Sequence, residues 1–333
     1  MGFVLGVDQG GTKTCAAVMD RGGNILSRRL TEGCYFHNEG LLRASRLIFE
    51  AIDDSLGSAG LTIDDIDITV AGVTGVDWDE DEAKVKNALF ERYGKSETIV
   101  CNDCEIAYYS GSVKPVGAVI CAGSGVNAAF FAPNGKKFVM GDYFKASSQG
   151  GSAIAKRAIE AVFDSDLGAV PHTGLTKLFL GFSNDSSIGE LLKKYVTDKD
   201  FRRSTIALVP MIVELANEGD EVALSVLTAF SDELCASFIA AMKKMNILEL
   251  NCDIVLAGGV FEGLTNCLTA MIARELARRA KNALLINAEY APVVGACIMG
   301  HLNKAGDNNE CFSKNIAVTA KKTGLTRLSP KLN

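Results

Sequence analysis

The segment DQGGTKT, near the start of the chain, has the residue types of a phosphate-binding turn. Gly10 and Gly11 can adopt a positive φ and let a ligand approach the backbone closely. Thr12 and Thr14 supply hydroxyl groups, and the amides of such a turn can point at a phosphate. Asp8 closes the preceding apolar run and could hold a hard cation such as Mg²⁺. An ordinary hairpin also explains the two glycines, but the five residues together favour the phosphate interpretation.

Two halves with the same kind of element order would position this turn. Apolar alternation and glycine turns predict, in the first half, three strands within residues 3–32, a helix at 39–55, a strand at 66–73, a helix at 77–93, a strand ending near 101 and a short helix to 110. The second half reads as three strands within 116–141, a helix at 151–163, a helical block at 187–246, a strand at 252–259, an amphipathic segment at 261–280, a strand at 283–288 and a helix at 293–302. The fold class is therefore α/β, and two such domains facing each other would place their glycine turns on opposite sides of one cleft.

We expect the domain boundaries to follow this repeat. They are 1–113 for the first domain, 114–290 for the second, 291–304 for a C-terminal helix that packs back on the first, and 305–333 for a tail. The tail carries a basic bias and reads as a solvated or partly ordered extension.

Bulk composition excludes several classes of protein. The chain has 333 residues, of which 48% are hydrophobic, so it can bury a sizeable core. Its net charge of −6 argues against nucleic-acid or anionic-membrane partners. We expect no membrane-spanning apolar run and no signal peptide, because the chain enters a strand at once. These features predict a cytoplasmic protein.

The ten cysteines lie mostly in apolar strands and helices, as reduced, buried residues of a cytosolic protein do. Cys101 and Cys104 form a CxxC, which can be redox-active or half of a zinc site. The chain has no second CxxC, and its three histidines lack ligand-like spacing. The pair is therefore expected to be structural.

A series of short motifs, in order, resembles the N-acetylglucosamine kinase family, which is grouped with the BadF/BadG-type ATPases in the actin/Hsp70/sugar-kinase fold. The resemblance covers residues 3–302. Its motifs are DQGGTKT at 8–14, Asn102-Asp103, AGSGVN at 122–127, GGSA at 150–153, NEGD at 217–220, LAGGV at 256–260 and PVVGA at 292–296. The resemblance implies two ribonuclease-H-like (actin-like ATPase) domains with a nucleotide cleft between them, and a homodimer.

The resemblance also implies roles for these residues. Asp103 would be the catalytic base that takes the proton from a sugar hydroxyl while the oxygen attacks the γ-phosphoryl group; a helix N-cap is the structural alternative. Asp8 would hold Mg²⁺ mostly through water. ATP would be bound by Gly10, Gly11, Thr12, Lys13, Thr14, Gly123, Ser124, Gly125, Gly258 and Gly259, although Lys13 could equally face solvent.

On the substrate side, the resemblance points to Asn38, Thr74, Gly75 and Asn127, with a helix cap as an equal alternative for Asn38. Gln149 stands where the family has a sugar-facing Asp, and Gly150 stands where it has Glu. This departure leaves phosphate transfer plausible and puts N-acetylglucosamine itself in doubt, because a hydrogen-bonding site strongly rejects a mismatched partner.

The leading interpretation is an ATP-dependent kinase of an amino sugar or a related sugar. The second is an ATPase that drives a partner reductase or dehydratase through an iron–sulfur cluster, for which Cys121 is the nearest ligand candidate. The third is a non-catalytic sugar or nucleotide sensor. The related ROK sugar kinases share DxGGTK, but their ExGH and CxCGxxGC zinc motifs are absent here.

Overall fold

A computed structural model describes residues 2–94, 97–262, 267–304 and 308–327. The chain divides into two compact units, which we treat separately. Unit 1 comprises Met1–Lys114 and Ala288–Arg327, and unit 2 contains Pro115–Asn287.

Unit 1 is built on a mixed five-stranded sheet with the order β3-β2-β1-β4-β5. Its strands are β1 (Phe3–Gln9), β2 (Lys13–Asp20), β3 (Ile25–Glu32), β4 (Ile66–Val73) and β5 (Thr98–Asn102). The first three strands are antiparallel, whereas β4 runs parallel to both β1 and β5. The register aligns Gln9 with Val73 and Val73 with Asn102. The carboxyl ends of the three parallel strands therefore lie in one row.

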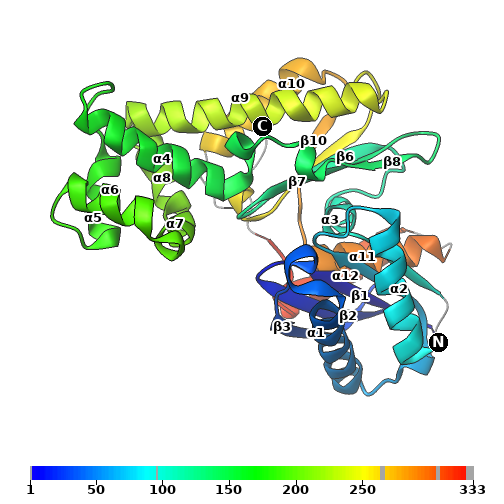
Figure 1. Cartoon of the computed structure of the whole chain (residues 1–333). Helices are drawn as coiled ribbons and strands as arrows, with labels where there is room; N and C mark the ends of the chain where they lie inside the picture. The colour runs from blue at the N-terminus through cyan, green and yellow to red at the C-terminus, as the bar shows by residue number, and fades with distance from the viewer. Residues whose placement is uncertain (1, 95–96, 263–266, 305–307, 328–333) are drawn as a thin grey trace. The chain divides into compact units, whose positions relative to one another are not determined.

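Helices cover both faces of this sheet because its central strands are apolar on both sides. On one face, α1 (Phe36–Ala59) and α2 (Asp79–Tyr93) share a core with alternate strand residues such as Leu5 and Val7. On the other, α3 (Asp103–Tyr109), α11 (Pro292–Asn303) and α12 (Glu310–Lys322) pack around Val4 and Val70 (Figure 1).

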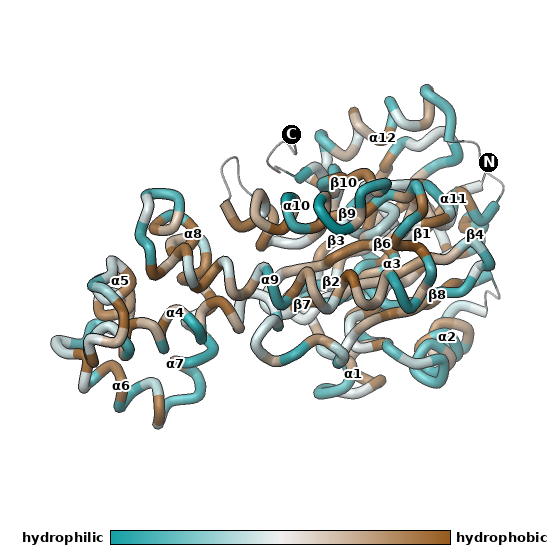
Figure 2. The backbone as a smooth tube through the Cα atoms, turned by 90° about the horizontal axis from the view of Figure 1, so that it is seen from above, coloured by the Kyte–Doolittle hydropathy of each residue, from teal (hydrophilic) through white to brown (hydrophobic). Residues whose placement is uncertain are grey.

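Unit 2 repeats this topology. Its strands are β6 (Gly117–Ala122), β7 (Val126–Phe131), β8 (Lys137–Val139), β9 (Asp253–Ala257) and β10 (Leu284–Asn287), in the order β10-β9-β6-β7-β8. Its helices are α4 (Gly150–Asp166), α5 (Gly174–Ser183), α6 (Ile188–Thr197), α7 (Lys199–Ser204), α8 (Val209–Asn217), α9 (Glu221–Lys244) and α10 (Cys267–Arg279). The tube of α6 alternates between polar and apolar colours, as expected of a helix with one buried face (Figure 2).

Two structural features bear on the sequence expectations. First, α9 is long and apolar enough to cross a membrane by length and composition, with a mean hydropathy of 1.5. Because 56% of that window is buried within unit 2, we interpret α9 as a core helix. Second, the tail is more ordered than expected. Phe312, Ile316 and Ala320 of α12 are buried in unit 1, and the Asn315 side chain donates a 2.8 Å hydrogen bond to the Gly22 carbonyl. The remaining tail residues, 305–307 and 328–333, lie outside the described part of the chain.

Candidate active site

Two acidic side chains meet at the row of strand ends in unit 1. Asp8 is the penultimate residue of β1 and is only 9% exposed, whereas Asp103 directly follows β5 and is partly buried. The strand register brings the two together, and the Thr74 amide after β4 closes the row with a 2.8 Å hydrogen bond to the Gln9 carbonyl. Side chains at the carboxyl ends of parallel strands commonly form the ligand site of α/β sheets.

Asn102, not Asp103, caps helix α3. The Asn102 side-chain oxygen accepts a 2.9 Å hydrogen bond from the Cys104 amide, and the Glu105 carboxylate accepts one from the Asn102 amide at 3.3 Å. This reciprocal pair is a capping box. The alternative interpretation of Asp103 as the helix cap is therefore wrong, and Asp103 occupies the first helical position instead.

The electrostatics of this pair suit proton transfer. Burial raises the pKa of Asp103 to about 7, and repulsion from Asp8 and Asp77 contributes to this increase. Hydrogen bonds from the Thr74 hydroxyl and the Cys104 amide lower the same pKa and so offset part of it. Burial also raises the pKa of Asp8 to about 6, with Arg327 and Lys13 acting in the opposite direction. A carboxylate that titrates near neutral pH is matched to accepting a proton from a hydroxyl.

Arg327 is a residue that the sequence analysis missed. It is placed by backbone pairing between residues 289–291 and the end of the tail. The Ala291 amide donates to the Leu325 carbonyl at 2.8 Å, and the Arg327 amide donates to the Glu289 carbonyl at 2.9 Å. Its charge acts on the buried Asp8, so a tail to which no function was attached contributes to the electrostatics of the site.

The glycine turn of unit 1 has an outer and an inner side. Gly11, Thr12 and Lys13 are exposed, and the Gly10 amide closes the turn on the Lys13 carbonyl at 2.9 Å. Thr14 differs from the expectation, because it is fully buried and its hydroxyl donates to the Glu32 carbonyl at 2.8 Å. The Thr14 side chain therefore braces the turn from behind.

The glycine turn of unit 2 joins β6 to β7 and is held by α4. The amides of Gly151 and Ser152 donate to the carbonyls of Gly123 and Ser124, at 2.8 and 3.0 Å. Ser124 and Gly125 are exposed at the tip of the turn.

Two further predicted substrate residues bind the backbone of unit 2. The Asn127 side-chain oxygen accepts hydrogen bonds from the amides of Ala128 (2.8 Å) and Gly141 (2.7 Å). Gln149 donates to the Phe144 carbonyl at 3.3 Å and accepts from the Val126 amide at 3.5 Å. Gln149 is thus tied to the backbone at the start of β7 and at Phe144.

The glycines of these motifs fall into two groups. The fold requires glycine at 150 and 258, because both residues have a positive φ (61° and 101°, respectively). A Cβ on Gly150 would lie 2.2 Å from the Gly125 carbonyl oxygen, and a Cβ on Gly258 would lie 2.3 Å from the Ala122 carbonyl oxygen. By contrast, a Cβ on Gly11, Gly123 or Gly259 would meet no atom within 4 Å. Nothing in the described structure requires glycine at these three positions, and the close approach of a ligand would explain it.

This difference predicts that alanine substitutions in the two groups of glycines affect different properties: ligand binding in one group and stability in the other. Gly123→Ala should leave the melting temperature within about 1 °C of wild type but weaken ATP binding about tenfold or more, because the added methyl occupies ligand space. Gly150→Ala should cost at least 1–3 kcal/mol of stability through strain, on the order given for such backbone positions. Gly181→Ala, on the open side of α5, is the matched control and should weaken neither property. Calorimetric ATP titrations and thermal melts of the three variants check this; loss of stability in Gly123→Ala would contradict it.

The loops before α1 and after β4 supply the remaining candidate residues. Asn38 is exposed in the first turn of α1, and the N-cap of that helix is Tyr35, so Asn38 does not cap it. Gly75 has a φ of 79°, and a Cβ there would lie 3.2 Å from the His37 ring. His37, which the sequence analysis passed over, lies with its Nε2 3.6 Å from Asp77 Oδ2.

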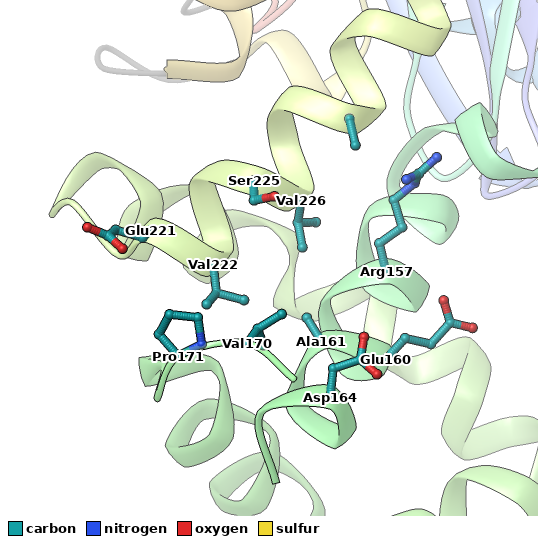
Figure 3. A pocket seen from close by; sticks show the side chains of 11 residues that line it. Arg157, Glu160, Ala161, Asp164, Val170, Pro171, Glu221, Val222, Ser225 and Val226 are labelled. Atoms are coloured by element: carbon teal, nitrogen blue, oxygen red, sulfur yellow. The ribbon is translucent and has the colours of Figure 1, made fainter. Parts of the chain in front are cut away.

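A pocket of about 440 Å³ in unit 2 lies between α4 and α9 (Figure 3). The one cation that lines it, Arg157, pairs with Glu233 at 2.8 Å and donates to the Ser147 carbonyl at 3.1 Å. Ser147 also donates to Glu233, and the hydrogen bond from Ser147, followed by that from Arg157, lowers the pKa of Glu233. Arg157 is thus engaged in holding the segment before Gln149. We therefore assign no ligand to this pocket.

No disulfide joins any of the ten cysteines in the described structure, and both Cys101 and Cys104 are buried. Within the described ranges, no group of three or more His, Cys, Asp or Glu side chains could enclose a metal ion. Cys121 lies within β6 and is partly exposed.

The two sheets of like topology, with helices and glycine turns, define an α/β fold of the actin-like ATPase class. This matches solved structures of a candidate N-acetylglucosamine kinase from Chromobacterium violaceum (16% identity, 90% of this chain and 99% of that one, TM-score 0.65) and of a ROK hexokinase from Thermus thermophilus (15% identity, 92% and 100%, TM-score 0.60). The chain belongs to the BadF/BadG/BcrA/BcrD ATPase family, whose model matches residues 5–300.

Two curated relatives are similar over most of their length. The chain is 27% identical over 313 residues to an N-acetyl-D-glucosamine kinase of Dictyostelium discoideum, covering 89% of this chain and 96% of the relative. It is 24% identical over 267 residues to an N-acetylmuramic acid/N-acetylglucosamine kinase of Clostridium acetobutylicum, covering 79% and 87%.

Proposed function

We propose that this protein uses ATP to phosphorylate a hydroxyl group of a sugar, and that the sugar is an amino sugar such as N-acetylglucosamine or glucosamine. The observation that carries the proposal is Asp103, a carboxylate with a pKa of about 7 next to Asp8 at the strand ends of unit 1. Membership of an ATPase family and similarity to two sugar kinases support it.

In the proposed reaction, Asp103 in its ionised form takes the proton of the acceptor hydroxyl while that oxygen attacks the γ-phosphorus of ATP. The bond to the β–γ bridging oxygen breaks, and ADP leaves. Burial keeps Asp103 basic enough to accept the proton, and the Thr74 hydroxyl orients its carboxylate through a hydrogen bond.

The residues present fit Mg²⁺ as the partner of ATP. Asp8 is a buried carboxylate whose raised pKa shows that its charge is incompletely compensated, and a dication would compensate it. Mg²⁺ is usually bound by one or two carboxylates together with water and substrate phosphates, rather than by a protein cage. When bound, it would neutralise charge on the phosphates.

We assign the phosphates of ATP to the turn residues Gly10, Gly11, Thr12 and Lys13 of unit 1 and Gly123, Ser124 and Gly125 of unit 2. Gly10 and Gly123 are half-buried, and the other five are exposed. Gly259 would allow the backbone to pass close to adenosine, while Gly258 shapes the strand end that presents it. Thr14 contributes through bracing alone.

The acceptor sugar is assigned to Asn38, Thr74 and Gly75. Asn127 and Gln149 would act on it indirectly, through the backbone segments that they hold, because the side-chain oxygens of both already accept backbone hydrogen bonds. We further propose a cytoplasmic homodimer, which light scattering of the purified protein would check.

The test is ADP release by the purified protein with Mg²⁺ and ATP. The panel contains N-acetylglucosamine, glucosamine, N-acetylmannosamine, N-acetylmuramic acid, glucose and a blank without sugar. We expect one sugar to raise the rate at least tenfold above the blank. An equal rate with every sugar and with the blank would favour the partner-driving ATPase instead, and iron content would then decide whether Cys121 takes part in a cluster.

A further inference from the structure

Three aromatic side chains gather beside the acid cluster of unit 1, and the proposed function gives them no role. The ring of His37 lies 5.1 Å from that of Trp78 and 6.3 Å from that of Tyr35, measured between centroids. Trp78 is 54% exposed and Tyr35 is 40% exposed. We call Tyr35, His37 and Trp78 the aromatic wall.

The wall is tied to the strand ends by specific contacts. Asp77 accepts a 2.8 Å hydrogen bond from the side chain of Asn102, which directly precedes Asp103. The other oxygen of Asp77 lies 3.6 Å from His37 Nε2, and Asp81 lies 4.0 Å from the same atom. His37 therefore lies close to Asp77, Asp81 and Trp78, and Asp77 connects it to the residue next to Asp103.

Two backbone features lie at the wall. Trp78 is the N-cap residue of α2 and has an extended backbone. The positive φ of Gly75 turns the loop toward His37, and a side chain at this position would press on the ring. A large aromatic side chain that is more than half exposed and lies beside a polar cluster is an arrangement that binding sites use for ligands with both apolar and polar surface.

We propose that the aromatic wall packs against the apolar C–H face, or the N-acyl methyl group, of the acceptor sugar, with Trp78 as the main contact. A sugar ring has one face of aliphatic C–H groups and a rim of hydroxyls, so it needs an apolar surface next to hydrogen-bonding groups. The wall supplies the first, and Thr74, Asp77 and Asp103 supply the second. This inference rests on the proposed function, whose acceptor site it completes.

The chain offers a direct reporter, because Trp78 is its only tryptophan. Titrating the full-length protein, without nucleotide, with each sugar of the panel should give a saturable change in tryptophan fluorescence for the sugar that stimulates ADP release. The response should be independent of protein concentration. A change that follows protein concentration and not sugar would assign the wall to contacts between copies of the chain, and would overturn the proposal.

Kinetics provide the second measurement. Trp78→Ala should raise the KM for sugar at least tenfold while the KM for ATP stays within twofold, and Trp78→Phe should recover most of the loss. Phe90→Ala removes another exposed aromatic side chain (52% exposed) of α2 and should change neither constant. Thermal melts establish that all three variants fold.

The outcomes separate this inference from the proposed function. Sugar-stimulated ADP release with an unchanged sugar KM in Trp78→Ala would overturn the wall and leave the kinase intact. A fluorescence response to a sugar without ADP release would support the wall and contradict the kinase. Absence of both responses with every sugar would overturn both.

Discussion

Replacing Asp103 with asparagine is expected to lower turnover about 10²-fold or more while ATP binds as in wild type, because the amide cannot accept the hydroxyl proton. The side chains have nearly the same shape, and Asn102 caps α3, so the helix keeps its start. Single-turnover phosphate transfer and calorimetric ATP titration measure the two properties.

The matched control for this variant is Asp54→Asn, which removes an exposed carboxylate from α1. It should retain full turnover. Near-normal turnover in Asp103→Asn would remove Asp103 as the base, and a parallel loss of ATP binding would show that the substitution acts on the nucleotide site instead.

The second large effect is on pH dependence. A base works only when deprotonated, so kcat/KM for the sugar should fall tenfold per pH unit below about 7, where Asp103 gains its proton. In Asp103→Asn, the residual kcat/KM should not show this fall near pH 7. A wild-type profile that is flat from pH 8 to pH 5 would contradict the assignment.

The raised pKa of Asp103 also affects stability, which should fall as pH rises, whereas activity should increase. The folded protein binds the Asp103 proton up to about pH 7, whereas the unfolded chain releases it near pH 3.8, so stability falls as pH rises through this window. Asp103→Asn should therefore be more stable than wild type at pH 8, by roughly 1–2 kcal/mol after allowance for its partial exposure. The difference should vanish near pH 4. Thermal melts at both pH values measure it.

The positions of Asp8 and Asp103 could be predicted because they depend on local patterns. Asp8 lies at the end of one apolar strand and Asp103 directly follows another, and parallel strands place their carboxyl ends together. The repeat of unit 1 in unit 2 was likewise visible as two meanders followed by strand and helix alternation. The inventory of helices was less accurate, because helix α5 was not predicted.

Other parts of the site depend on contacts that no local pattern contains. His37 and Trp78 are 41 positions apart in the numbering, and only the packing of two loops joins their rings. Arg327 reaches the surroundings of Asp8 because the end of the tail pairs with residues 289–291. The burial of Thr14 follows from the β2–β3 register, which places its hydroxyl under the Glu32 carbonyl.

The most direct test of the central claim is detection of the phosphorylated sugar itself. Wild type and Asp103→Asn are incubated with Mg²⁺, ATP and each sugar of the panel, and the products are separated and weighed by mass spectrometry. We predict a sugar monophosphate, formed in step with ADP, with one amino sugar and wild type, and at least 10²-fold less of it with Asp103→Asn. ADP without any sugar phosphate, or equal yields from the two proteins, would contradict a kinase that works through Asp103.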